Sequence, residues 1–318
     1  MDSINHITAK IKGIKYAPLL CRDLHTFEFE ELDRAIPEAA TFILRINRKN
    51  QIALSWWVSA KRTRSYPYAR VYDSLSFSGR KVTIIPFVKD EGIEGDRDFL
   101  QWDTISLMSL LGVYVIITYY EDAIVSSRFD RKITKQRFNI AHINQQIKKL
   151  LSYQSDALHW NLAQIDSIGD IGRKAIDSYE RISRKLGVDM HSKDSAKRRM
   201  EELEKGKEAF ITLSRNLAKS AQKRESLTIQ PKENLRGIKG AITIANYLGG
   251  IYYFTSDEVE VHGSGVSLID AKHTKTHDLP SLGDIKDGLL KMILFTNLED
   301  VRIRNRRLNP IPILKLTT

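Results

Sequence analysis

The sequence has a single cysteine, Cys21, among 318 residues, which excludes an intramolecular disulfide framework and favours a reducing compartment. A long hydrophobic run is also missing. The most apolar stretch, Ile105 to Tyr120, is interrupted by Ser106, Ser109 and Gly112 and falls short of a membrane span. No signal-peptide pattern, internal repeat or low-complexity tract is visible. These absences predict a cytoplasmic protein with no membrane association.

Positive charge is concentrated in the middle of the chain. Residues 1–127 hold 16 basic and 16 acidic side chains, and residues 240–318 hold nine of each sign. Residues 128–239 hold 25 basic against 14 acidic side chains, which accounts for the whole net charge of +11. Such a patch attracts polyanions. The alternative is that lysine and arginine simply solvate long helices.

The pattern divides the chain into three predicted parts. Residues 1–127 form an N-terminal α/β unit, in which Thr41–Asn47, Ile52–Val58 and Lys81–Phe87 are expected strands and Asp103–Leu111 an expected helix. This unit is interpreted as a DNA-recognition or partner platform. Residues 128–230 are predicted to be a basic helical segment, largely helical over Ile133–Gln222. Residues 231–318 are predicted to form a separate C-terminal core.

The stretch from Thr255 to Thr274 predicts a β-hairpin that turns at Gly263-Ser264. Folding the arms about this turn pairs Val261 with Val266, Val259 with Leu268, and Asp257 with Asp270, all on one face. Lys272 follows on the same face. Opposed carboxylates repel unless a cation lies between them, so Asp257 and Asp270 are candidate ligands for a divalent ion. The simpler alternative is an exposed Asp-Lys pair on an edge strand.

The elements around the hairpin favour the functional interpretation. Lys232–Tyr247 has apolar residues at helical spacing, and Ile251–Thr255 is an expected strand before the hairpin. Ser281 is an expected cap for a second helix that runs through Leu282 to Ile293, and Val301–Arg304 is an expected closing strand. The predicted order is helix, three strands, helix, strand.

This arrangement resembles the core of the PD-(D/E)xK nucleases. Ser256-Asp257 stands in place of Pro-Asp, and Asp270-Ala271-Lys272 stands at the (D/E)xK position. The segments Asp270 to Thr274 and Gly283 to Lys291 resemble a type II restriction endonuclease in particular. The resemblance implies an α/β fold with a mixed sheet flanked by helices, and it covers about 90 residues.

The activity that this resemblance implies is hydrolysis of DNA phosphodiester bonds with Mg²⁺ as cofactor. Asp257 and Asp270 would be the metal ligands, Lys272 would lie near the scissile phosphate, and Glu233 is the position for an added acidic residue from the first helix. The expected protein is a site-specific endonuclease of a restriction-modification system. Cleavage of both strands of a symmetric double-stranded site favours a homodimer.

Several basic and aromatic residues are candidates for DNA contact. They follow a strand in the N-terminal unit, recur along the later helices, or lie on the last strand with Arg306. They are Lys61, Arg62, Arg64, Tyr66, Arg70, Arg215, Lys219, Lys223, Arg302 and Arg304.

Two alternatives stay open. A non-catalytic DNA-binding protein would use the hairpin carboxylates only to pair with Arg302 and Arg304. A different nuclease would place its site in the acidic loop that contains Asp96 and Asp98, since hard cations favour clustered carboxylates. In the N-terminal unit, Ser59-Ala60-Lys61 also ends a strand, but serine replaces the carboxylate there.

Overall fold

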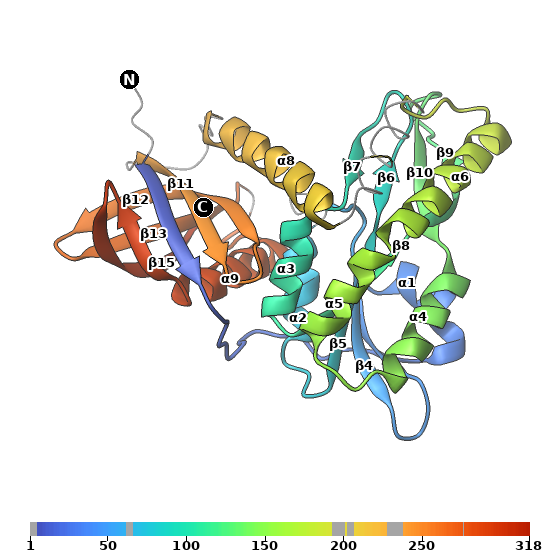
Figure 1. The fold of residues 1–318 in the computed structure, drawn as a ribbon, viewed down its shortest axis with the longest axis horizontal. Helices are drawn as coiled ribbons and strands as arrows, with labels where there is room; N and C mark the ends of the chain where they lie inside the picture. Colours follow the sequence, from blue (N-terminus) through green and yellow to red (C-terminus); the bar gives the residue numbers. More distant parts are fainter. Residues whose placement is uncertain (1–4, 62–65, 193–200, 202–206, 228–237, 276) are drawn as a thin grey trace. The chain divides into compact units, whose positions relative to one another are not determined.

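The computed structural model describes residues 5–61, 66–192, 201, 207–227, 238–275 and 277–318 (Figure 1). Over these residues the protein is mixed α/β, with eight α-helices and several sheets that include a closed six-stranded barrel. The chain forms two compact units. Unit 1 comprises Met1–Cys21 and Leu213–Thr318, and unit 2 comprises Arg22–Thr212. None of the described helices has the length and apolar character needed to cross a membrane.

Unit 1 is built on the barrel, whose strand order is β1, β11, β12, β13, β15, β14. Strands β11, β12 and β13 form an antiparallel meander, and β15 lies parallel to β13. Strand β1 pairs in parallel with β11 and antiparallel with β14, so it joins segments far apart in the sequence. The bounds are β1 Asn5–Ile11, β11 Ile238–Asn246, β12 Ile251–His262, β13 Gly265–His273, β14 Glu299–Ile303, β15 Arg306–Thr317, α8 Lys207–Leu227 and α9 Leu282–Thr296.

The first 127 residues are therefore not one unit in the structure. The hydrogen bonds of β1 place the N-terminus in unit 1, and the compact units divide the chain near residues 21 and 212 rather than at 127 and 230.

Apolar side chains hold the barrel and α9 together. Ile242, Phe254 and Leu268 are buried on the meander, and Leu290 and Leu294 are buried on α9. Helix α9 packs against β13 and β15. The Ser281 side chain accepts a hydrogen bond from the Asp284 backbone N–H, which confirms the predicted N-cap of this helix.

Two predictions for unit 1 were wrong. The expected helix over Lys232–Tyr247 is instead strand β11 over its described part, because β-branched residues adjoin one another at Ile242, Thr243 and Ile244 and suit a strand better. The expected short strand and first hairpin arm are one continuous strand, β12. The predicted turn and the pairs Val261–Val266 and Val259–Leu268 are confirmed.

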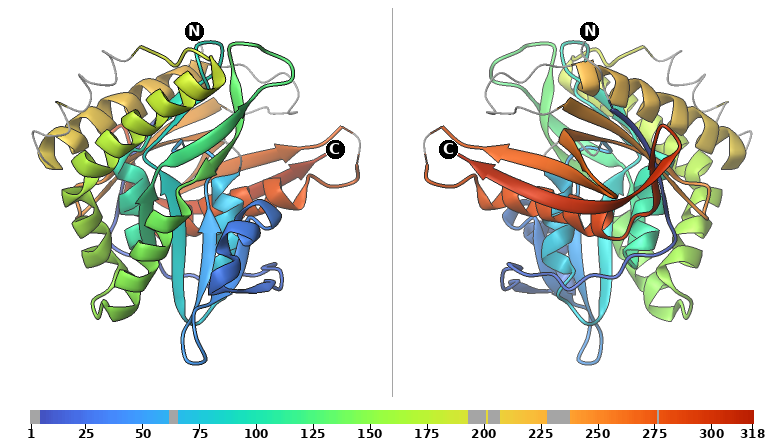
Figure 2. Two further views of the ribbon diagram at one scale, coloured as in Figure 1. Left: turned by 90° about the vertical axis from the view of Figure 1, so that its right-hand side faces the viewer. Right: turned by 90° about the vertical axis from the view of Figure 1, so that its left-hand side faces the viewer.

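Unit 2 is built on a five-stranded sheet in the order β2, β3, β4, β5, β8. Strand β3 is antiparallel to β4, whereas β4, β5 and β8 are mutually parallel. Helix α2 packs against β3 and β4, while α4 and α5 pack against β8 (Figure 2). The sheet strands are β2 Thr26–Glu28, β3 Thr41–Arg45, β4 Gln51–Trp56, β5 Arg80–Pro86 and β8 Val113–Thr118.

The helices of unit 2 are η1 Phe29–Glu31, α1 Leu32–Glu38, α2 Pro67–Ser74, α3 Trp102–Leu110, α4 Ile140–Ser152, α5 Ala157–Asp166 and α6 Ile168–Leu186. Two antiparallel ribbons complete the unit. They are β6 Val88–Asp90 with β7 Arg97–Phe99, and β9 Tyr120–Val125 with β10 Ile133–Phe138.

The three strands and the helix predicted for this region are confirmed, with ends that differ by one or two residues. The helical segment predicted from Ile133 begins instead with β10, and the first helix starts at Ile140. The predicted acidic loop is the β6–β7 ribbon.

Candidate active site

Asp270 lies at the centre of a buried cluster of charged side chains in unit 1. It lies on β13 beside Leu314 of β15, and its side chain is only 1% exposed. Lys291 Nζ lies 2.7 Å from Asp270 Oδ1, and Lys272 Nζ lies 3.0 Å from Oδ2. Both ammonium groups are themselves largely buried. A carboxylate this deep in the protein is stabilised only by such partners.

Helix α9 supplies two of the cluster's side chains. Asp287 and Lys291 are one helical turn apart and so share a face of α9. Asp287 Oδ2 accepts a hydrogen bond from Lys272 Nζ at 3.2 Å. Gly288 lets the helix approach closely, since a Cβ there would lie 3.3 Å from Asp270 Oδ2 and 2.5 Å from Leu314 Cδ1. Lys291 and Asp287 were not among the predicted site residues.

Asp257 reaches the cluster from a β-bulge in β12. Between the pairs Ile238–Val259 and Gly240–Ser256, β12 has one more residue than β11. The β12–β13 pairs end at Glu258–Ile269, so the predicted pair Asp257–Asp270 is not part of the ladder. Instead Asp257 Oδ2 accepts a hydrogen bond from the Ala271 backbone N–H at 2.7 Å. The bulge therefore re-aims the Asp257 carboxylate toward β13.

Buried hydrogen bonds hold the bulge in place. The Ser256 side chain is fully buried, and its Oγ lies 2.7 Å from the Glu258 carbonyl oxygen and 2.8 Å from that of Ile269. Glu258 is also buried and forms an ion pair with Lys315 at 3.1 Å. Glu258 thus points away from the cluster and has its own cation.

The two carboxylates differ in electrostatic environment. Burial, and then the nearby negative charge of Asp270, raise the pKa of Asp257 above its ordinary value. Burial also acts to raise the pKa of Asp270, but Lys291 and Lys272 outweigh it and hold that pKa below its usual range. Burial acts to lower the pKa of Lys291, while Asp270 and Asp287 together raise it. At neutral pH Asp270 is therefore ionised and Lys291 is protonated.

The donor atoms fit Mg²⁺ better than a transition metal. Among the residues that the structure describes, no group of three or more His, Cys, Asp or Glu side chains is arranged to hold a metal ion. Mg²⁺ binds through one or two carboxylates and completes its shell with water and substrate phosphate. Asp257 and Asp270 are the two carboxylates present for such a site, and Asp270 already pairs with Lys272 and Lys291. Glu233, the third predicted acidic residue, lies outside the described residues.

The predicted DNA-contact residues of unit 2 fall into two groups. Arg62 and Arg64 lie outside the described residues. Of the others, Tyr66 is 54% exposed, and Lys61 Nζ lies 4.0 Å from the Asp98 carboxylate. Arg70 lies 4.3 Å above the Trp56 ring and donates to the Trp56 carbonyl oxygen at 2.7 Å. Burial lowers the pKa of Arg70 to about 10, and its contacts with Trp56 hold this side chain within unit 2.

The predicted basic residues of unit 1 lie on α8 and at the end of the barrel. Lys219 and Lys223 are exposed on α8, while Arg215 donates a hydrogen bond to the Gly249 carbonyl oxygen. Arg302 pairs with Asp300 at 2.8 Å, and Arg304 lies in the β14–β15 turn with φ +46°. The prediction that Arg302, Arg304 and Arg306 lie on one strand was wrong, because Arg302 is in β14, Arg304 is in the turn and Arg306 begins β15.

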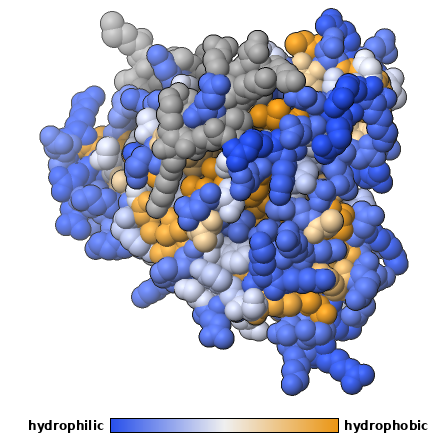
Figure 3. All heavy atoms as spheres, turned by 45° about the vertical axis from the view of Figure 1, so that its right-hand side comes forward, coloured by the Kyte–Doolittle hydropathy of each residue, from blue (hydrophilic) through white to orange (hydrophobic). Residues whose placement is uncertain are grey.

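Most of the surface visible in Figure 3 is hydrophilic, with hydrophobic side chains in small separate patches.

The acidic residues of the β6–β7 ribbon are already paired within unit 2. Asp98 is buried and accepts a hydrogen bond from Ser59 Oγ at 2.8 Å. Glu91 lies 2.5 Å from Lys89 Nζ and 2.9 Å from Lys132 Nζ. Burial acts to raise the pKa of Glu91, but the hydrogen bonds from these lysines outweigh it and lower that pKa to about 2.

Comparison of the chain with protein-family models, curated proteins and solved structures gives no match. The function therefore has to be argued from the geometry of the site alone.

Proposed function

We propose that this protein is a Mg²⁺-dependent, site-specific DNA endonuclease of the type II restriction class, with its active site at Asp257, Asp270 and Lys272. The observation that carries the proposal is the buried Asp270 carboxylate, approached by Asp257 from a bulge and by Lys272 and Lys291 from two elements. Perturbed, partly buried charges that converge on one point are typical of catalytic sites.

The strand topology around this cluster supports the same proposal. Helix α8 precedes the meander β11, β12 and β13, and α9 then leads to β14 and to β15, which is parallel to β13. A PD-(D/E)xK core contains the same kinds of elements, although here the segment predicted as its first helix is strand β11, the two strands predicted next are the single strand β12, and β15 rather than β14 lies beside β13. Asp270-Ala271-Lys272 occupies the last residues of the third meander strand.

The side chains have separate roles in the proposed mechanism. Asp257 and Asp270 would hold Mg²⁺, which activates water and shields phosphate charge when bound. Lys272 presents its ammonium group to the phosphate and stabilises charge that develops in the transition state. Lys291 and Asp287 act indirectly, through neighbouring side chains. Lys291 keeps Asp270 ionised, and Asp287 orients Lys272.

Binding of the substrate is assigned to positive charge outside this cluster. The exposed Lys219 and Lys223 on α8 would contact the phosphate backbone, and the exposed Arg302 and Arg304 would contribute at the end of the barrel. Two copies of the chain, acting on the two strands of a symmetric site, would complete the enzyme within a cytoplasmic restriction-modification system.

A second candidate function is a DNA-binding protein without catalysis. One observation favours it: Asp270 already has two lysine partners, so its charge is balanced without a metal. The sequence-based alternative expected the hairpin carboxylates to pair with Arg302 and Arg304. In the structure Asp270 pairs with Lys272 and Lys291 instead. A third candidate, a nuclease whose site is the Asp96 and Asp98 region, is weakened by the contact of Asp98 with Ser59.

Metal dependence separates the first two candidates. Several unrelated DNAs would be incubated with the full-length protein in Mg²⁺, in Ca²⁺ and in EDTA, and DNA binding would be measured in parallel. The nuclease proposal expects discrete fragments in Mg²⁺ only. Binding of DNA in all three conditions, with every DNA intact at high protein concentration, would establish the binding protein instead.

A further inference from the structure

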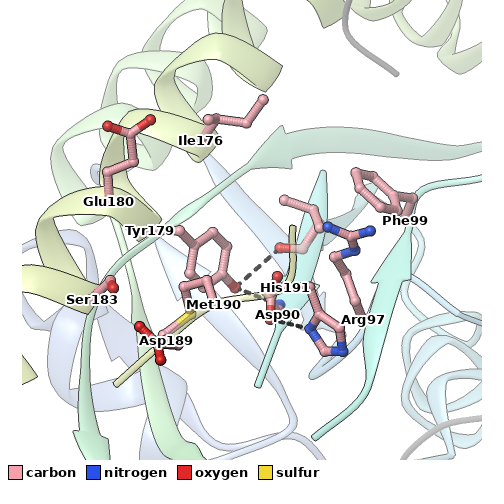
Figure 4. Close-up of a pocket in the computed structure, with 11 residues that line it drawn as sticks. Asp90, Arg97, Phe99, Ile176, Tyr179, Glu180, Ser183, Asp189, Met190 and His191 are labelled. Carbon is pink, nitrogen blue, oxygen red and sulfur yellow. Dashed lines mark hydrogen bonds and ion pairs between the residues drawn. The ribbon is translucent and has the colours of Figure 1, made fainter. Parts of the chain in front are cut away.

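Unit 2 contains a cavity of about 250 Å³ between the β6–β7 ribbon, α6 and the residues that follow α6 (Figure 4). The ribbon contributes Val88 and Phe99 to its wall, and α6 with the segment after it contributes Ile176 and Met190. A cavity of this size with apolar walls suits one small, flat ring system.

The ribbon and α6 are joined by buried hydrogen bonds, so the cavity is preformed. The Tyr179 hydroxyl accepts from the Asp90 backbone N–H at 2.9 Å and donates to Gln136 Oε1 at 2.9 Å. Asp90 Oδ1 lies 2.8 Å from His191 Nδ1. Figure 4 shows these two side chains pointing at each other, with Arg97 beside them on β7. Asp90 therefore holds His191 in one orientation at the wall.

Acidic side chains predominate among the polar groups of the cavity. Asp90, Glu180 and Asp189 contribute carboxylates, against the cations Arg97 and, when protonated, His191. A phosphate would be repelled by this set, whereas N–H groups on a flat ring would be accepted by it. The exocyclic amino group of a nucleobase is such a donor, and carboxylates are known to accept from it.

Two basic residues lie next to the cavity on α6. Arg184 and Lys185 follow the lining residue Ser183 directly on α6 and are exposed. Lys185 also forms an ion pair with Asp122 at 2.8 Å. Basic side chains beside an apolar and acidic cavity would favour entry of the ring while the phosphates stay outside.

We propose that this cavity binds a nucleobase that carries an exocyclic amino group, between the apolar walls of β6–β7 and α6 and against the carboxylate of Asp189. Taking DNA as the source rests on the proposed function, and the base would then be extruded from the duplex. Extrusion is easiest at a mispair. A free nucleoside of the same chemistry is the other source.

The test uses the full-length protein in EDTA, so that cleavage plays no part. In one arm, binding of deoxyadenosine, deoxycytidine, deoxyguanosine and thymidine is measured by calorimetry. In the other arm, affinity is compared for short duplexes that are fully paired or contain one mispaired cytosine or thymine.

Three variants accompany each arm. Ser183→Phe fills the cavity, and Asp189→Asn removes a lining charge at an exposed position. Asp177→Asn is the matched control, because Asp177 is exposed on α6 but does not line the cavity. Circular dichroism checks that each variant is folded.

The proposal expects at least one amino-bearing nucleoside, or the duplex with a mispaired cytosine, to bind about tenfold more tightly than its thymine counterpart. That preference should disappear in Ser183→Phe, weaken in Asp189→Asn and persist in Asp177→Asn. A preference seen only with duplexes assigns the base to DNA, and one seen only with nucleosides assigns it to a free ligand.

Equal binding of thymine, unchanged binding by a folded Ser183→Phe, or no binding in either arm overturns the proposal. A failure of DNA cleavage would leave these results untouched, so the two proposals fail independently.

Discussion

Replacing Lys291 with methionine should destabilise unit 1 more than any exposed lysine substitution does. The change keeps the apolar stem but removes the ammonium group 2.7 Å from the buried Asp270 carboxylate. At an effective dielectric constant of about 20, the lost Coulomb attraction is about 6 kcal/mol. Lys272 still lies 3.0 Å from Asp270, and the ammonium group of Lys291 no longer has to be desolvated. The expected net loss is about 2–4 kcal/mol at pH 7.

The assay has to separate the two units. All four tryptophans lie in unit 2, so tryptophan fluorescence in urea follows that unit alone. Hydrogen exchange of peptides from β13 and α9 follows unit 1. We expect Lys291→Met to increase exchange in those peptides and to leave the fluorescence midpoint unchanged. Lys275→Met is the control, since Lys275 is exposed, and it should change the stability by less than about 0.5 kcal/mol.

The dependence of stability on pH gives the result that would refute the role assigned to Lys291. Because the folded-state pKa of Asp270 is lowered, its contribution to stability is present above its ordinary pKa and is lost as the pH falls below that value. Without Lys291 that pKa rises toward or above its ordinary value, so the acid-dependent loss should shrink or reverse in the variant, and the stability difference from wild type should narrow as the pH falls. If Lys291→Met matched Lys275→Met in exchange and in pH dependence, the assigned role of Lys291 would be wrong.

Three further predictions concern single side chains. Glu91→Gln should cost about 1–2 kcal/mol at pH 7 and remove the part of the stability that is lost between about pH 4 and pH 2, measured by fluorescence in urea, because the pKa of Glu91 is lowered to about 2 in the folded state. An identical pH profile to wild type would refute it. Ser256→Ala should cost about 1–2 kcal/mol and slow cleavage, since it loosens the bulge that carries Asp257; unaltered exchange in β12 would count against this. Gly288→Ala should slow DNA cleavage about tenfold or more by displacing α9 from the site, with a change in stability below about 1 kcal/mol, and full activity in the variant would contradict the close approach.

The hairpin could be predicted from the sequence because its signal is local. Glycine and serine at the turn, with valine and leucine alternating on both arms, fix the pairs Val261–Val266 and Val259–Leu268. Ser281 likewise predicted the start of α9 by a rule that involves only neighbouring residues. Both features depend on residues within a few positions of one another.

The rest of the site depends on contacts that a linear pattern does not contain. Lys291 joins the cluster only because α9 lies against β13, and Gly288 is the residue that permits that approach. The register shift in β12 depends on β11, a strand that was predicted as a helix because its isoleucines fell at helical spacing. Strand β1 pairs with residues more than 230 positions away, which no local pattern indicates.

The central claim is that phosphodiester cleavage takes place at Asp257, Asp270 and Lys272. The most direct measurement is the rate of Mg²⁺-dependent DNA cleavage by wild type, Asp270→Asn and Asp98→Asn, with DNA binding measured for each protein. We predict that Asp270→Asn binds DNA but loses more than about a hundredfold in rate, whereas Asp98→Asn cleaves at close to the wild-type rate. Cleavage that survives in Asp270→Asn and disappears in Asp98→Asn would contradict the account and move the chemistry to unit 2.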